Sequence, residues 1–329
     1  MGIARLDQGR RREVELGHLR SRWTYAGEAA GCVNVGVRRL EVPAGGWSTP
    51  AHQHGRDEEI FYVLSGRGLS WQGGEVCEVG PGDCIVYLAR GGAHTLHALE
   101  PLDVLTFGDR HEDESVSFPR LGMSFVGTRM VDSIPGMTDG LPTQFVRESE
   151  LGPPLLPDAP DPPDAPDAPD APDPRGAAGP RPPTVVNVED VEAVTVERSR
   201  VARTRRNLGR AAGSVTTGIQ HVQVVPGRES APAHCHSIEE EIFVILDGDG
   251  VVVLGEEEFP VQAGHVVARP AGTGVAHVFR AGEAGLTYLA YGMRDPGDLC
   301  FYPRSRKIAF RGLGVIARIE SLDYWDGED

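Results

Sequence analysis

The chain has 329 residues, a formal net charge of −16 and a pI near 5.1. This length suits two ordinary domains, and the acidic balance without a basic stripe argues against a nucleic-acid-binding protein. No segment is apolar enough to span a membrane, and the charged N-terminus lacks the apolar core of a signal peptide, so we expect a cytoplasmic protein.

The first predicted strands carry a spaced set of polar residues. Residues 46–66 contain the pattern G-x5-H-x-H-x4-E-x6-G, whose polar members are His52, His54 and Glu59. Two histidines at i and i+2 share one face of a strand. The run 60–64 is apolar, β-branched and aromatic, which predicts a second strand and a hairpin that returns Glu59 to the two histidines.

A fourth residue of ligand type follows on a later predicted strand. His94 comes after the turn at 80–83. Three imidazoles and one carboxylate suit Fe, Mn, Co, Ni or Zn and leave open positions on an octahedral ion. A structural zinc site would more often be closed by cysteines, and the five cysteines of this chain form no C-x-x-C pair. We therefore expect an open metal site and reduced thiols.

The middle of the chain is a break in composition. Residues 153–183 are dense in proline, with a near-repeat of Asp-Ala-Pro, and such a segment cannot bury a core. We expect a slack Pro/Ala/Asp-rich linker over 151–183 between an N-terminal domain, 1–150, and a C-terminal domain, 184–329. The basic run 200–210 is interpreted as a solvated loop.

The polar pattern then occurs a second time. The second copy contains His234, His236, Glu241 and, later in the chain, His277. An offset of 182 aligns the two copies, and twelve of twenty-one positions around the motif are identical. An internal duplication is the simplest account. Two copies of three histidines and one glutamate in the same order indicate two metal sites.

These motifs resemble those of the cupin superfamily, and the chain resembles a bicupin, in particular an uncharacterised bacterial bicupin group. The first cupin motif is matched in full in the first copy. In the first copy the second cupin motif is looser, because Leu88 replaces its proline and His94 comes one residue late. In the second copy that motif, G-x5-P-x-G-x2-H, is partly kept at Gly264, Pro270, Gly272 and His277, with two extra residues before the histidine.

The resemblance implies an all-β fold of two tandem double-stranded β-helix, or jelly-roll, barrels over 1–150 and 184–329. It also implies a divalent transition metal in each barrel, up to two per chain, with Fe(II) or Mn(II) favoured and Zn, Ni or Co as alternatives. Glu59 and Glu241 are in addition candidate catalytic bases. The proposed metal ligands are His52, His54, Glu59, His94, His234, His236, Glu241 and His277.

Residues that share strand parity with these ligands should face the same interior. Such a pocket would be largely apolar, which suits a small substrate held away from bulk water. The candidate pocket residues are Phe61, Val63, Phe243, Ile245, Phe279 and His221.

Three functional hypotheses remain open, because the fold alone does not choose a function. The leading one is a metal-dependent oxidoreductase of dioxygenase type that acts on a small oxygen-chelating substrate. The second is a non-oxidative isomerase, epimerase or decarboxylase resembling oxalate decarboxylase, and the third is a non-catalytic metal or small-ligand binder. The second copy matches the motifs better, so we expect it to be the active one. A monomer with paired barrels and a homodimer are both compatible with the sequence.

Overall fold

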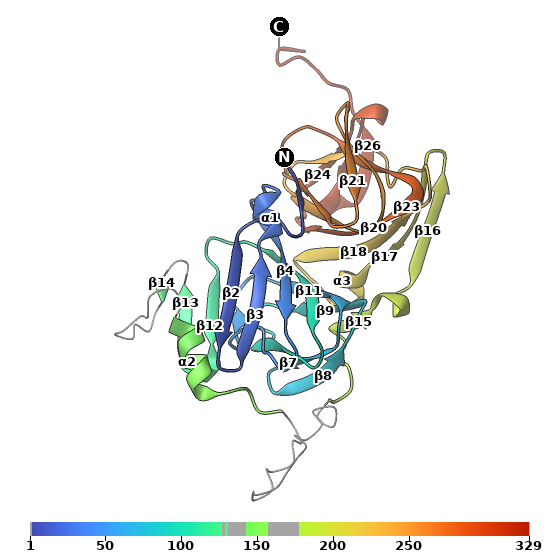
Figure 1. Cartoon of the computed structure of the whole chain (residues 1–329). Helices are drawn as coiled ribbons and strands as arrows, with labels where there is room; N and C mark the ends of the chain where they lie inside the picture. The colour runs from blue at the N-terminus through green and yellow to red at the C-terminus, as the bar shows by residue number, and fades with distance from the viewer. Residues whose placement is uncertain (1, 127–128, 131–142, 157–177, 329) are drawn as a thin grey trace, which may run out of the picture.

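The protein forms two barrels made mostly of strands (Figure 1). The computed structural model describes residues 2–126, 129–130, 143–156 and 178–328. The all-β expectation is confirmed. The described helices are short: α1 (Ala26–Ala29), α2 (Thr143–Leu151) and α3 (Leu208–Ala211). None of them is both long and apolar enough to cross a lipid bilayer.

The N-terminal barrel is built from antiparallel strands that follow the predicted hairpins. Its strands are β2 (Arg11–Leu16), β3 (Leu19–Thr24), β4 (Val35–Val42), β5 (Gln53–His54), β6 (Glu59–Ser65), β7 (Gly68–Gln72), β8 (Glu75–Val79), β9 (Asp83–Tyr87), β10 (His94–Ala98), β11 (Leu102–Asp109), β12 (Ser115–Phe118), β13 (Met123–Val126) and β14 (Arg129–Met130). The order β9-β6-β11-β4-β3-β2 forms the larger sheet, and β10-β7-β8 and β14-β13-β12-β5 complete the barrel.

The C-terminal barrel repeats this plan. Its strands are β16 (Ala193–Arg198), β17 (Val201–Arg206), β18 (Thr217–Val224), β19 (Cys235–His236), β20 (Glu241–Leu254), β21 (Glu257–Gln262), β22 (His265–Arg269), β23 (His277–Met293), β24 (Leu299–Tyr302), β25 (Lys307–Phe310) and β26 (Val315–Arg318). The long strands β20 and β23 correspond to β6 with β7 and to β10 with β11. The helices α1 and α3 also occupy equivalent places, so the duplication extends well beyond the motifs.

Each half lends its first strand to the other barrel. Strand β1 (Gly2–Arg5) pairs with β22, and β15 (Val185–Asn187) pairs with β9. The N-terminus accordingly lies beside the C-terminal barrel in Figure 1. Within the predicted linker, 157–177 lie outside the described residues, but Arg181 is fixed to Asp83 of the N-terminal barrel by two contacts of 2.6 and 2.7 Å. The two barrels are therefore joined by exchanged strands as well as by the linker.

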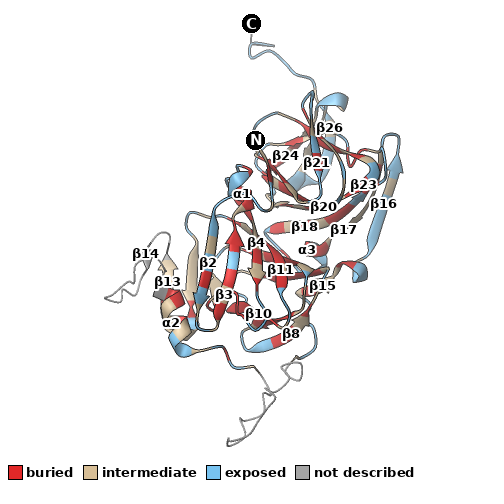
Figure 2. Cartoon of the chain, in the orientation of Figure 1, coloured by how far each residue is buried: buried red, intermediate tan, exposed pale blue. Residues whose placement is uncertain are grey.

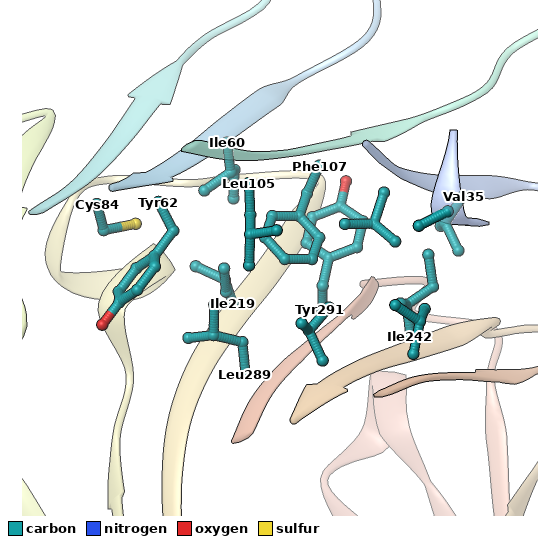
Figure 3. Packing of buried hydrophobic residues seen from close by; sticks show 14 of the residues in the cluster. Val35, Ile60, Tyr62, Cys84, Leu105, Phe107, Ile219, Ile242, Leu289 and Tyr291 are labelled. Atoms are coloured by element: carbon teal, nitrogen blue, oxygen red, sulfur yellow. The ribbon is translucent and has the colours of Figure 1, made fainter. Parts of the chain in front are cut away.

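A shared apolar core lies between the barrels. Figure 3 shows Leu105 and Phe107 of one barrel facing Leu289 and Tyr291 of the other. The rings of Phe107 and Tyr291, which occupy equivalent positions of the repeat, lie 5.1 Å apart. Figure 2 shows buried residues inside each barrel and along this contact, whereas β16 is largely exposed. Burial of apolar surface of this kind stabilises the pairing of the barrels.

Two buried glutamates join the barrels reciprocally. Glu58 of the N-terminal barrel accepts hydrogen bonds from the N–H groups of Val215 and Thr217, at 2.8 and 3.1 Å, and from the Thr217 hydroxyl at 2.7 Å. Glu240, its equivalent, accepts from the N–H groups of Val33, Asn34 and Val35. The contact has the self-complementary form of a twofold dimer interface, but within one chain.

The basic run 200–210 corrects the sequence analysis. It is not a solvated loop, because β17 pairs with both β16 and β18, and α3 follows it. Strand alternation turns Arg203 and Arg205 to one face, and both line a cavity. From the sequence alone, several arginines close together resemble a solvated loop. The strand pairing that turns two of them into a cavity is a long-range feature that the sequence does not reveal.

Candidate metal centres

The N-terminal barrel brings its four predicted ligands together. The Glu59 carboxylate Oε2 lies 3.1 Å from His94 Nε2, 3.4 Å from His54 Nε2 and 3.8 Å from His52 Nε2. All four donor atoms lie within 4.8 Å of one another. His52 and His94 face each other across an antiparallel bridge, with backbone hydrogen bonds of 3.2 and 2.8 Å. Three imidazoles and one carboxylate thus converge on one point inside the barrel.

The displaced His94 reaches the site because the preceding loop is tightly turned. Arg90 has φ 60° and Gly92 has φ 109°, both in the region that favours glycine. The Arg90 N–H donates to the carbonyl of His54 at 2.8 Å, which fastens the loop beside the site.

The C-terminal barrel places its predicted ligands around Glu241. Its Oε2 lies 3.1 Å from His277 Nε2 and 3.7 Å from His236 Nε2. His234, Glu241 and His277 form one group of donors within 4.8 Å, and His234 and His236 form another with the thiol of Cys300. Sequence reasoning did not single out Cys300.

Backbone carbonyls orient the first histidine of each pair. The Nδ1 atoms of His52 and His234 lie 3.0 and 2.9 Å from the carbonyl oxygens of Pro50 and Pro232. A proton on Nδ1 then makes the hydrogen bond and leaves the Nε2 lone pair facing the site. This arrangement fits a metal ligand.

A carboxylate supports the second histidine of each pair, and the sequence analysis missed both carboxylates. His236 Nδ1 lies 2.6 Å from Asp298 Oδ2, and His54 Nδ1 lies 3.4 Å from Glu114 Oε1. Each carboxylate also accepts N–H groups from the loop that follows its histidine, over 55–57 and 237–239. The two positions correspond at an offset of 184 rather than 182, so they fall out of register with the motif.

The electrostatics of both sites suit a divalent cation. Burial lowers the pKa of His94 and of His234 to about 4, so these imidazoles are neutral near pH 7. Burial would raise the pKa of Glu59 and Glu241, but the neighbouring histidines lower it well below the ordinary value. Burial lowers the pKa of His54, but the carboxylates of Glu59 and Glu114 outweigh burial and raise it to about 10 in the metal-free protein. A divalent ion would replace the proton that these carboxylates hold on His54, because a ligating imidazole is neutral.

Replacing Glu114 with glutamine is expected to reduce the acid sensitivity of the metal-free protein. Burial raises the pKa of Glu114, but His54 and the N–H groups of Asp57 and Gly55 lower it from 4.5 to about 2. Since the folded-state pKa lies below the unfolded value, ionised Glu114 stabilises the fold, and this contribution is lost as pH falls from 4.5 towards 2. Urea denaturation at pH 7 and pH 3 should show a smaller loss for E114Q than for wild type, with exposed Glu13→Gln as control. If E114Q and wild type lost equal stability between pH 7 and pH 3, the stabilising role of ionised Glu114 would be contradicted.

A cavity opens beside each site, and the two cavities differ in charge. The N-terminal cavity has a volume of about 440 Å³ and is lined by three carboxylates and two arginines, namely Asp57, Glu59, Asp109, Arg38 and Arg110. The C-terminal cavity, of about 400 Å³, is lined by two carboxylates and four arginines, namely Glu239, Glu241, Arg203, Arg205, Arg294 and Arg311. The C-terminal cavity is therefore the more cationic of the two.

The predicted apolar pocket residues occupy three different environments. Phe243 and Phe279 line the C-terminal cavity, and Phe61 lines a smaller cavity at the first site. Val63 and Ile245 are buried deeper in their barrels and belong to the core. His221 needs correction, because Gly218, Gln220 and Val222 of β18 line the cavity, and alternation turns His221 to the opposite face.

One further position near the ligands differs between the barrels. Opposite Glu59, Tyr87 stacks on His94 with ring centroids 3.9 Å apart. The residue paired with Glu241 is Arg269, which is 3% exposed, and its Nε and Nη1 have no hydrogen-bond partner among the described residues. A buried guanidinium thus stands near the second site where the first has a phenol ring.

The comparison with protein families agrees with this geometry. The family described as "Cupin domain" matches residues 38–108 and 220–289. Each segment contains one complete set of three histidines and one glutamate. The chain therefore carries two cupin domains. It is a bicupin, a two-domain member of the cupin superfamily.

Solved structures show the same double-barrel architecture. Oxalate decarboxylase from Bacillus subtilis matches with a TM-score of 0.54 at 18% identity, over 88% of this chain and 75% of that one. The glyoxylate-induced protein from Pseudomonas aeruginosa matches with a TM-score of 0.54 at 14% identity, over 86% of this chain and 84% of that one. At these identities the likeness shows the fold alone. No curated protein matches the sequence.

Proposed function

We propose that the chain is a metal-dependent enzyme that acts on a small carboxylate-bearing anion by non-oxidative chemistry, of decarboxylase or isomerase type. The C-terminal barrel is the proposed active site. The observation that carries this proposal is the cavity that four arginines line together with His234, His236, Glu241 and His277. The dioxygenase hypothesis has no comparable support from the site.

The arginines of this cavity favour an anionic ligand. Burial lowers the pKa of Arg203 and of Arg294, which means that their surroundings disfavour the positive charge. Arg203 and Arg205 have no ion pair within the described ranges of the chain, whereas Arg311 contacts Glu239. A partly buried cation without a counter-ion is costly, and a bound carboxylate would offset that cost through paired hydrogen bonds.

The same positions of the N-terminal barrel are not basic. At the offset of 182, Ser21 and Trp23 stand where the C-terminal barrel has Arg203 and Arg205. The Ser21 hydroxyl instead donates to the carbonyl of Ser48, and Trp23 belongs to the core. This difference favours the C-terminal barrel as the place where an anion binds, and a structural or regulatory role for the first site.

The residues of the C-terminal site have separable proposed roles. His234, His236, Glu241 and His277 would hold a divalent ion, which supplies Lewis-acid polarisation of a bound carboxylate or carbonyl. Fe(II) and Mn(II) are the favoured candidates, and the oxalate decarboxylase of B. subtilis has Mn(II) centres. The strongly lowered pKa of Glu241 suits a ligand better than its other proposed role as a base.

The cavity walls complete the proposed site. The arginines would orient the anion through charge-assisted hydrogen bonds, so that its reacting carbon lies over the histidine and glutamate donors. The aromatic residues Phe243, Phe279 and Tyr288 line the same cavity and would limit the access of water.

Metal analysis combined with a substrate screen tests the proposed function. Protein purified without chelator should contain about two equivalents of a divalent transition metal, one for each group of donors. With small mono- and dicarboxylates, product formation should require metal and leave dissolved oxygen unchanged. Stoichiometric oxygen consumption with an enediol, diketone or catechol would favour the dioxygenase hypothesis instead. Protein that holds no metal after reconstitution would overturn the proposal.

Replacing Arg203 and Arg205 with alanine is expected to weaken substrate binding strongly. Each charge-assisted hydrogen bond contributes about 1.5–3 kcal/mol, so KM for the anion should rise roughly tenfold or more for each residue that contacts it. KM should rise less in Arg203→Lys than in Arg203→Ala, because lysine keeps the positive charge. Arg22 lies on β3, the equivalent of β17, and pairs with Glu13 at the surface, so Arg22→Ala is a matched control. Unchanged KM in the double variant would show that the anion binds elsewhere.

A further inference from the structure

The C-terminal site contains a donor that the N-terminal site lacks. The thiol of Cys300 lies within 4.8 Å of the donor nitrogens of both His234 and His236. Two donors bound to one ion at about 2.0–2.3 Å each are separated by at most about 4.6 Å. The observed grouping is therefore close to the span of a shared coordination sphere.

Strand register directs this thiol into the site. Cys300 on β24 pairs directly with His236 on β19, so both side chains project from the same face of the ladder. Both residues line the C-terminal cavity. The neighbouring Cys235 pairs with Phe301 and belongs to the opposite face. The thiol is thus placed by the same geometry that places the second histidine ligand.

The N-terminal barrel provides an internal comparison. There Val116 on β12 pairs with His54 on β5, in the same register as Cys300 and His236. Val116 also lines its cavity. The two barrels therefore present an isopropyl group and a thiol at one equivalent point beside the histidines.

A second observation concerns His236, whose side chain is 7% exposed. Its Nδ1 lies 2.6 Å from Asp298, and its Nε2 has no hydrogen-bond partner in the part of the chain that the structure describes. This Nε2 points into the site, 3.7 Å from Glu241 Oε2. A ring nitrogen without a hydrogen-bond partner, on a mostly buried side chain beside a thiol and a carboxylate, is suited to a metal ion.

We infer that Cys300 is an additional metal ligand of the C-terminal site, so that the two barrels select different ions. The inference rests on the proposal that the histidine and glutamate groups bind metal. A thiolate favours thiophilic ions such as Zn(II), Co(II) or Fe(II), whereas a set of only nitrogen and oxygen donors also accommodates Mn(II). Of the two ions favoured above, the C-terminal site would therefore take Fe(II) in preference to Mn(II), whereas the N-terminal site would accept either.

Cobalt substitution of the full chain tests this inference. Metal-free protein loaded with Co(II) should show visible ligand-field absorption from both sites and a near-ultraviolet thiolate-to-cobalt charge-transfer band from one. Cys300→Val, which copies the residue of the other barrel, should lose the charge-transfer band but keep the ligand-field absorption. Cys235→Val should keep both, and Val116→Cys should strengthen the charge-transfer band. Zinc affinity of the C-terminal site should fall roughly tenfold or more in Cys300→Val.

The possible outcomes separate the two proposals. Ligand-field absorption without a charge-transfer band in wild type would overturn ligation by Cys300 and leave metal binding by the histidines intact. A charge-transfer band that persists in Cys300→Val would also overturn it. No cobalt absorption of either kind would refute the underlying metal sites. Circular dichroism of each variant verifies that the fold is retained.

Discussion

Replacing His234 and His236 together with alanine is expected to remove one metal equivalent and to abolish turnover. The pair supplies two of the four predicted ligands of the C-terminal site, and Glu241 and His277 alone leave too few protein donors for a stable catalytic ion. Loss of several kcal/mol of Lewis-acid stabilisation corresponds to a decrease of kcat by roughly a thousandfold or more. Metal analysis and steady-state kinetics on the same preparations measure both effects.

The matched variant is His52→Ala with His54→Ala, which removes the equivalent pair from the N-terminal barrel. It should also lose one metal equivalent, but it should keep most of the turnover, because the arginines that favour the anion line the other cavity. Loss of turnover in this variant alone would move the active site to the N-terminal barrel. Loss in both would indicate that the two sites depend on each other.

The two groups of histidine and glutamate were predictable because their information is local and repeated. His52, His54 and Glu59 are fixed by strand alternation and one hairpin, and the second copy confirms that the spacing is not accidental. The supporting carboxylates were not predictable in this way. Glu114 and Asp298 reach their histidines from about sixty residues away, and a shift of register hides their equivalence.

The substrate side of the site was harder to predict than the metal side. A charge run is usually solvated, and nothing local distinguishes Arg203 and Arg205 from a surface loop until β17 is paired on both sides. The prediction that His221 lines the cavity was wrong because of strand register. A shift of one residue decides which face of a strand a side chain takes. Cavity walls depend on long-range pairing, which local spacing does not encode.

The pairing of the barrels also depends on distant contacts. Strand β1 lies more than 250 residues from its partner β22 in the sequence, and Glu240 is 205 to 207 residues from the N–H groups that it accepts. A repeat in the sequence reveals two similar domains. It does not reveal that each lends a strand to the other.

Replacing Glu240 with alanine is expected to destabilise the protein strongly, because it removes a buried contact between the two barrels. The carboxylate is fully buried and accepts the N–H groups of Val33, Asn34 and Val35 from the other barrel. Each buried donor left without a partner costs about 1–3 kcal/mol, so a total loss of about 3–5 kcal/mol in the free energy of unfolding is expected. Urea denaturation followed by tryptophan fluorescence and circular dichroism measures it.

Glu58→Ala provides the matched test, because Glu58 makes the reciprocal contact to residues 214–217. If the pair acts as one self-complementary interface, both variants should lose similar stability, and their double variant should lose less than the sum. Exposed Glu13→Ala should change stability by no more than about 0.5 kcal/mol. Wild-type stability in Glu240→Ala would contradict the proposed contribution of the two buried glutamates to the pairing of the barrels. Separate unfolding transitions for the two barrels in either variant would show that these carboxylates, rather than the shared apolar core alone, make the barrels unfold as one unit.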